Sequence, residues 1–140
     1  QGCGSKTGMQ DGFYSAEMSG YSHGWKEYVC IMVKGGKIVY TEFNAKDPSG
    51  YIKAWDNAYM QNMASVSGTY MQTMLHSNGT YPNEYTRYYA AELLEHQDPS
   101  NVDALSGATS SGTNFKKLTT AVIEQAIAGN PNTRIVETEE

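Results

Sequence analysis

Long apolar runs are missing from this chain of 140 residues. No stretch approaches the roughly 18 to 20 consecutive apolar residues that a membrane-spanning helix needs, so the sequence predicts no spanning segment. Clusters of positive charge are missing too, since the largest is the pair Lys116 and Lys117 and the formal net charge is -5. Nucleic-acid binding depends mainly on a basic surface that neutralises phosphates, and nucleic acid is therefore not an expected partner.

Clusters of metal-ligating or catalytic residues are equally scarce. The three histidines, His23, His76 and His96, lie far apart and have no HExxH or CxxC companion. We therefore expect no metal site. Acidic residues form no pair whose spacing indicates acid–base catalysis, and we do not expect the chain to be an enzyme by itself.

Cysteine occurs only twice. Cys30 lies in an apolar run and is expected to be a buried free thiol. Cys3 follows a small residue and precedes a polar stretch to about Gln10, a pattern that resembles the acylation site of a bacterial lipoprotein. A cloning remnant and a disulfide between the two cysteines are the alternatives. We predict that residues 1–10 form a tether and residues 11–140 a single domain.

Tyrosine and methionine are what the chain has in quantity, with 11 Tyr and 7 Met beside few aliphatic residues. A buried tyrosine hydroxyl needs a hydrogen-bond partner, and methionine adapts its shape to irregular gaps. This composition suits an interior adapted to a ligand as well as an ordinary core.

The first part of the chain has the pattern of strands. Residues 11–18, 25–33 and 37–43 are strand-like, the second of them with two alternating faces, and Gly35-Gly36 separates the last two segments. Two glycines between strands favour a hairpin, because both turn positions there take a positive φ. We therefore predict an antiparallel meander of three strands.

The remainder has mainly helical periodicity. Helices are predicted over residues 54–63, from Pro82 to the stop at Asp98-Pro99, and along a final stripe of apolar residues that ends at Gly129. Residues 133–138 are a candidate closing strand. The predicted fold class is α+β, with an antiparallel meander sheet packed against several helices.

The segment 103–112, just before the final helix, consists mostly of Ser, Thr, Gly and Asp. Backbone N–H groups at a helix N-terminus favour a bound phosphate, and Gly107 allows close approach to a ligand. Capping of the helix by Thr109, Ser110 or Ser111 explains the same residues, and spacing alone leaves both interpretations open.

Two better-known motifs fail in this segment. A P-loop requires Lys-Ser/Thr where Thr113-Asn114 stands, and the serines do not have the spacing of a nucleophile elbow. Nucleotide hydrolysis and serine hydrolysis are therefore not supported.

The same segment resembles the flavinylation motif of the FMN-binding domain family, in Asp103, Ser106, Gly107, Ala108, Thr109 and Ser110. In that family, a separate magnesium-dependent flavin transferase uses FAD to esterify a threonine with the FMN phosphate. Further matching segments make the chain similar, over roughly residues 11–130, to the single-domain extracellular members found in lipoproteins of Gram-positive bacteria. Those segments are 11–14, 24–29, 36–38 and 115–118, together with Lys53, Asp56, Tyr59 and Met63.

This resemblance implies that Thr109 is the covalent FMN attachment site. A threonine hydroxyl is a weak nucleophile without an adjacent base, and no histidine is near Thr109 in the sequence, so Thr109 is interpreted as the acceptor of a modification. The other cofactor-binding residues would be Ser106, Gly107, Ala108 and Ser110 around the phosphate, with Trp25, Lys53, Trp55, Asp56, Tyr59 and Met63 as candidates around the flavin ring. Ordinary core or surface roles are the alternative for each ring candidate.

The resemblance further implies an extracytoplasmic electron carrier, anchored by a lipid on Cys3 to the outer face of the cytoplasmic membrane. A membrane oxidoreductase or quinol would donate electrons, and an extracellular acceptor or reductase would receive them. Two alternatives remain open. One is a flavin reductase acting on a small molecule, and the other is a non-redox binding or signalling lipoprotein whose motif only caps a helix.

Overall fold

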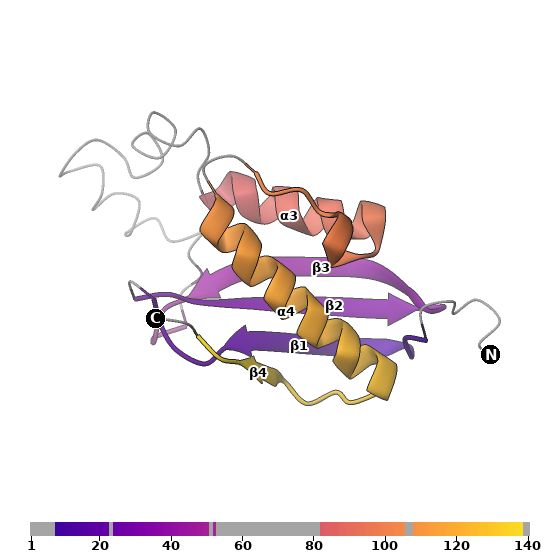
Figure 1. Ribbon diagram of the computed structural model, residues 1–140. Coiled ribbons are helices and arrows are strands. Elements are labelled where there is room, and N and C mark those ends of the chain that lie inside the picture. Colours follow the sequence, from indigo (N-terminus) through magenta and orange to yellow (C-terminus); the bar gives the residue numbers. More distant parts are fainter. Residues whose placement is uncertain (1–7, 23, 51, 53–81, 106–107, 139–140) are drawn as a thin grey trace.

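The computed structural model describes residues 8–22, 24–50, 52, 82–105 and 108–138. These residues form a four-stranded sheet with two long helices packed on one of its faces (Figure 1). The expected α+β class is confirmed. The helix predicted over 54–63 lies outside the described residues.

Three antiparallel strands come first in the chain: β1 (Gly12–Met18), β2 (Lys26–Lys34) and β3 (Lys37–Lys46). The predicted hairpin between β2 and β3 is present. Its two turn residues, Gly35 and Gly36, have φ values of 64° and 74°. This left-handed backbone is what a tight two-residue hairpin turn requires, and glycine adopts it without steric cost.

The fourth strand, β4 (Arg134–Val136), pairs with β1 and gives the strand order β3-β2-β1-β4. It runs parallel to β1, so the sheet is mixed, where the sequence predicted an antiparallel one. The direction follows from the preceding helix, which ends beside the start of β1: the Gln10 N–H donates to the Ala126 carbonyl over 2.9 Å. A strand that leaves from that end of the sheet must run the same way as β1.

The helices are α3 (Pro82–His96), a short 3-10 helix η3 (Pro99–Asn101) and α4 (Thr109–Ala128). The predicted start of α3 at Pro82 and the predicted stop of α4 at Gly129 are confirmed. Gly129 takes the left-handed conformation, with φ 69°, that commonly ends helices.

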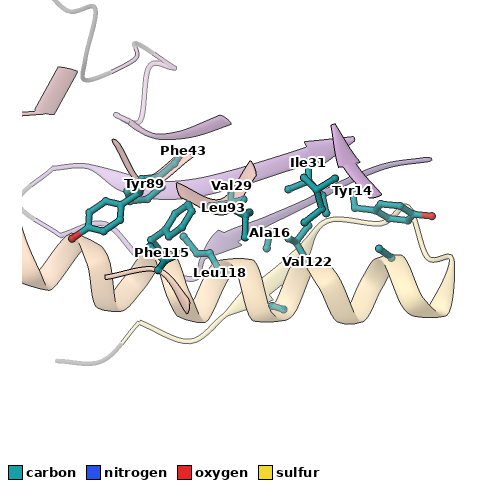
Figure 2. Close-up of a cluster of buried hydrophobic side chains, with 14 of the residues drawn as sticks. Tyr14, Ala16, Val29, Ile31, Phe43, Tyr89, Leu93, Phe115, Leu118 and Val122 are labelled. Carbon is teal, nitrogen blue, oxygen red and sulfur yellow. The ribbon is translucent and has the colours of Figure 1, made fainter. Parts of the chain in front are cut away.

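The core lies between the sheet and the two helices (Figure 2). Alternate side chains of β1 and β2 point into it, as the period of two predicts, and they meet apolar stripes of α3 and α4. The fully buried members include Ala16, Val29, Ile31, Tyr89, Leu93, Phe115, Leu118 and Val122.

Cys30 is a free thiol, as predicted, but the expectation that it is buried is wrong. It follows the buried Val29, so strand alternation turns it to the sheet face opposite the helices, where it is half-buried. The apolar run around it belongs to both faces of the strand.

Candidate functional site

The segment that resembles the flavinylation motif leads into α4, and Thr109 is the first residue of that helix. The side chains of Thr109 and Ser110 are exposed, whereas Ala108 is buried. The interpretation that Thr109, Ser110 or Ser111 caps α4 is wrong, because the N-cap is Ala108 and no side chain makes a capping hydrogen bond. The first turn of α4 itself contains no acidic residue.

The hydroxyl of Tyr89 in α3 holds the described residues on either side of Ser106 and Gly107. It accepts a hydrogen bond from the Leu105 N–H and donates one to the Ala108 carbonyl, each over 2.9 Å. Ser106 and Gly107 themselves lie outside the described residues. The position of the N-cap of α4 therefore depends on a buried hydroxyl from the preceding helix.

Aromatic packing fixes the ring of Tyr89, which is completely buried. The ring stacks on Phe115 of α4 with centroids 5.3 Å apart and meets Phe43 of β3 edge-on at 6.1 Å. Phe43 and Phe115 also touch each other, at 4.9 Å. Three elements thus hold one ring, and its hydroxyl has little freedom to move.

Gly112, one turn into α4, allows this arrangement. A Cβ on Gly112 would overlap the Tyr89 hydroxyl. The glycine is therefore required for close approach of the two helices, and its φ is not in the left-handed region.

Glu27 of β2 ties the first turns of α4 to the sheet. Its carboxylate accepts hydrogen bonds from the Ser111 hydroxyl, over 3.0 Å, and from the Asn114 side-chain amide, over 2.7 Å. The Ser111 hydroxyl is thereby directed toward the sheet, while Thr109 and Ser110 are exposed. Of the three hydroxyls at this helix start, Thr109 and Ser110 are the two that face solvent.

Three of the predicted site residues therefore lie together: Ala108, Thr109 and Ser110. Trp25 is 7% exposed, immediately precedes β2 and forms an isolated bridge with Ser22. The other predicted positions lie outside the described residues: Cys3, Lys53, Trp55, Asp56, Tyr59, Met63, Ser106 and Gly107.

Sequence reasoning missed the roles of Tyr89, Glu27 and Gly112. The first had a usable signal, since a tyrosine on the predicted buried stripe of a helix needs a partner for its hydroxyl. Glu27 and Gly112 had none, because their partners are distant in sequence.

A groove of about 550 Å³ lies elsewhere, between α4 and β4. It contains none of the predicted flavin-site residues, so it is separate from the start of α4. Its lining includes Lys116, Lys117, Glu124, Arg134, Ile135 and Glu137.

The described part of the chain lacks both a metal-binding cluster and a membrane-spanning helix. No group of three or more His, Cys, Asp or Glu side chains there is arranged to hold a metal ion. No helix among those residues is long and apolar enough to cross a membrane.

Comparison with known proteins places this fold among relatives. The solved structure of the CPE2226 protein of Clostridium perfringens is 31% identical to the chain, with a TM-score of 0.76, and the match covers 94% of this chain and 99% of that one. The chain belongs to the family of the CPE2226 protein. A solved structure from Clostridium thermocellum is 26% identical, with a TM-score of 0.51, over 90% of this chain and 95% of that one.

A curated relative adds a second kind of information. The 15 kDa lipoprotein of Treponema pallidum (strain Nichols) is 29% identical over 129 residues, which are 91% of this chain and 84% of that protein. This likeness supports a lipoprotein-type family. No family model matches the chain. The resemblance to the FMN-binding domain family therefore stays a prediction.

Proposed function

We propose that the protein is an extracytoplasmic electron carrier whose FMN is attached through a phosphoester to Thr109. The observation that carries the proposal is the start of α4. Its first residue is an exposed threonine, its N-cap has no capping side chain, and its first turn contains no acidic residue of its own. A helix start of this kind favours an anionic group, and a phosphate on the Thr109 side chain would stand there.

The residues present fit such a group. Thr109 supplies the hydroxyl to be esterified, and the N-terminal backbone of α4 supplies N–H donors and the positive end of the dipole. Tyr89 fixes the N-cap, and Glu27 holds the Ser111 hydroxyl. Trp25, which is buried and immediately precedes β2, is a candidate contact for the flavin ring.

Attachment would use an external enzyme, because a threonine hydroxyl is a weak nucleophile without an adjacent base and no histidine is near Thr109 in the sequence. In the proposed modification, the Thr109 oxygen bonds to the phosphorus of the FMN half of FAD, and the pyrophosphate bond breaks to release AMP. The hydroxyl proton leaves with the aid of the flavin transferase and its magnesium ion. Once attached, FMN supplies one- and two-electron redox chemistry, which the protein orients and tunes.

A covalent bond suits a protein outside the cytoplasm. A cofactor held there only by equilibrium binding would be lost to dilution, and an ester does not dissociate. The likeness to a treponemal lipoprotein supports this location and a lipid on Cys3. A membrane oxidoreductase or quinol is the proposed donor, and an extracellular acceptor or reductase the proposed recipient.

Co-expression with a flavin transferase, followed by intact-mass measurement under denaturing conditions, tests the proposal. We expect the wild-type chain to gain the mass of FMN less one water, and Thr109→Ala to gain nothing. Ser110→Ala is the matched control, because its hydroxyl is also exposed at the start of α4. An adduct that survives Thr109→Ala, or no adduct on the wild-type chain, would refute the assignment.

A further inference from the structure

The exposed apolar side chains of the protein are concentrated at one end of the sheet. Seven large hydrophobic residues are exposed among the described residues, and four of them lie on the first strands near the β2–β3 hairpin. Their exposed fractions are 51% for Phe13, 43% for Met32, 48% for Val39 and 44% for Tyr40. Isolated apolar residues on a surface are ordinary, but a contiguous group indicates a contact surface.

Strand register shows that this group is contiguous. Phe13 of β1 pairs with Met32 of β2, which pairs in turn with Tyr40 of β3. These three side chains form one row across the sheet, on the face opposite α3 and α4, because their strand neighbours Tyr14, Val33 and Thr41 are the buried ones. Val39 is the extra residue of a bulge beside this row.

Two lysines complete the group. Lys34 and Lys37 pair directly across the hairpin and are both exposed. Each adjoins a buried residue, Val33 and Ile38 respectively, so strand alternation puts both lysines on the same face as the apolar row. We call Phe13, Met32, Lys34, Lys37, Val39 and Tyr40 the hairpin patch.

The other end of the same face is ionic. Glu17 lies 3.5 Å from the Lys26 ammonium group and 3.3 Å from that of Lys46. Tyr28 donates a hydrogen bond to Glu42 over 2.7 Å. The hairpin end thus carries four of the exposed apolar side chains, whereas Ile135 of β4, which pairs with Glu17, lies at the ionic end.

The N-terminal part of the chain joins the domain at this end. The Asp11 side chain accepts a hydrogen bond from the Gly36 N–H of the hairpin, over 3.3 Å. Figure 1 shows β1 beginning beside the turn that joins β2 and β3. Only seven residues separate Cys3 from Asp11, and the chain between these two residues spans at most about 30 Å when fully extended.

We propose that the hairpin patch rests on the surface of an anionic lipid bilayer. This inference depends on the lipid anchor at Cys3 in the proposed function, because the short tether brings this end of the domain to the membrane. The apolar side chains would enter the boundary between headgroups and acyl chains, and Lys34 and Lys37 would pair with lipid phosphates.

The proposal fixes the direction in which the candidate flavin site faces. Glu27, at the start of β2, contacts the first turns of α4, whereas Lys34 ends the same strand in the patch. Nine residues of β2 span roughly 30 Å. Thr109 therefore lies about one strand length along β2 from the hairpin patch, toward the end of the sheet farther from the tether.

Quenching by brominated lipids tests this orientation. The full chain carries Cys30→Ser, so that Cys3 alone couples to a maleimide lipid. The vesicles contain phosphatidylglycerol and phosphatidylethanolamine, and one of two matched sets has brominated acyl chains. Tyr40→Trp reports on the patch. Tyr21→Trp is the matched control, because Tyr21 is 45% exposed and lies beyond the far end of β1. Trp25 and Trp55 contribute the same background to both variants.

We expect brominated vesicles to remove about half or more of the fluorescence added by Tyr40→Trp and to leave that added by Tyr21→Trp unchanged. Lys34→Gln with Lys37→Gln should weaken the contact roughly tenfold. Equal quenching of the two reporters, no quenching of either, or a patch covered by a second copy in cross-linking would overturn the proposal. The maleimide lipid supplies the tether, so this result does not depend on acylation or flavinylation in a host. Intact-mass measurement of host-expressed protein tests those two modifications separately.

Discussion

The Tyr89 hydroxyl donates to the Ala108 carbonyl over 2.9 Å and so joins α3 to the N-cap of α4. The same oxygen accepts from the Leu105 N–H. One buried side chain thereby binds two backbone groups within the predicted flavin-attachment segment, on either side of Ser106 and Gly107. A buried backbone group without a partner is costly, so this hydroxyl specifies the local backbone conformation as well as stabilising it.

Replacement of Tyr89 by phenylalanine should therefore destabilise the protein and disturb the start of α4. We expect Tyr89→Phe to lower the free energy of unfolding by about 1–3 kcal/mol, because the Leu105 N–H loses the Tyr89 oxygen and the Ala108 carbonyl keeps only the Gly112 N–H. Urea unfolding measures this. Tyr88→Phe is the control, since its hydroxyl binds the Asp103 carbonyl at an exposed position and should matter less. Equal losses for the two variants would contradict the role given to Tyr89.

Gly112→Ala should destabilise the protein although alanine favours helices. The added methyl group would overlap the Tyr89 hydroxyl, whose ring is held by Phe43 and Phe115. Overpacking of this kind costs about 1–3 kcal/mol, which exceeds the gain of about 1 kcal/mol in helix propensity. Thr113→Ala, an exposed change at the next position, is the control in thermal unfolding. A rise in melting temperature for Gly112→Ala would show that α3 and α4 are less closely packed.

Asn114→Asp should make the stability of the protein depend on pH. The new carboxylate would face Glu27, whose oxygen accepts from the Asn114 amide over 2.7 Å. At pH 7 the two charges repel each other, and we expect a loss of about 1–3 kcal/mol relative to Asn114→Ala. The difference should shrink as the pH falls below about 5, where one carboxyl binds a proton and donates it to the other. A difference in unfolding free energy between Asn114→Asp and Asn114→Ala that does not change with pH would contradict the contact between Asn114 and Glu27.

Cys30 should react slowly with alkylating reagents at neutral pH. Burial, and secondly the negative charge of Glu42, raise the pKa of its thiol from 9.0 to about 11. The thiolate fraction at pH 8 is then about a hundredfold smaller than at the ordinary pKa, and the iodoacetamide rate in a Cys3→Ser chain should fall accordingly. Glu42→Gln should lower the pKa of Cys30 and speed the reaction. A rate equal to that of an exposed cysteine would contradict this prediction.

The same pKa shift has a defined sign in stability. The thiol of the unfolded chain ionises near pH 9, before the folded one does at about pH 11. Stability from this group is therefore fully present below about pH 9 and declines as the pH rises toward 11. Cys30→Ser should remove that part of the alkaline decline.

The local parts of the fold were predictable from sequence, because they depend on short-range chemistry. Gly35-Gly36 predicted the hairpin, and the apolar stripe ending at Gly129 predicted α4. The direction of β4 was not predictable, since it depends on where α4 ends relative to β1. The apolar run around Cys30 did not reveal that this residue faces away from the helices.

The candidate site divides in the same way. The sequence marked Thr109 through its motif, but it left a capping role open, and the structure excludes that role by placing Thr109 inside the helix. The contacts that position this residue come from Tyr89 and Glu27, which are distant in sequence from the start of α4. No local pattern encodes such contacts.

Peptide mapping of protein purified from its native host tests the central claim most directly. After denaturation, removal of small molecules and digestion, the account predicts that flavin absorbance stays with one peptide, and that fragmentation places FMN on Thr109. A colourless denatured protein, or FMN on a residue other than Thr109, would contradict it.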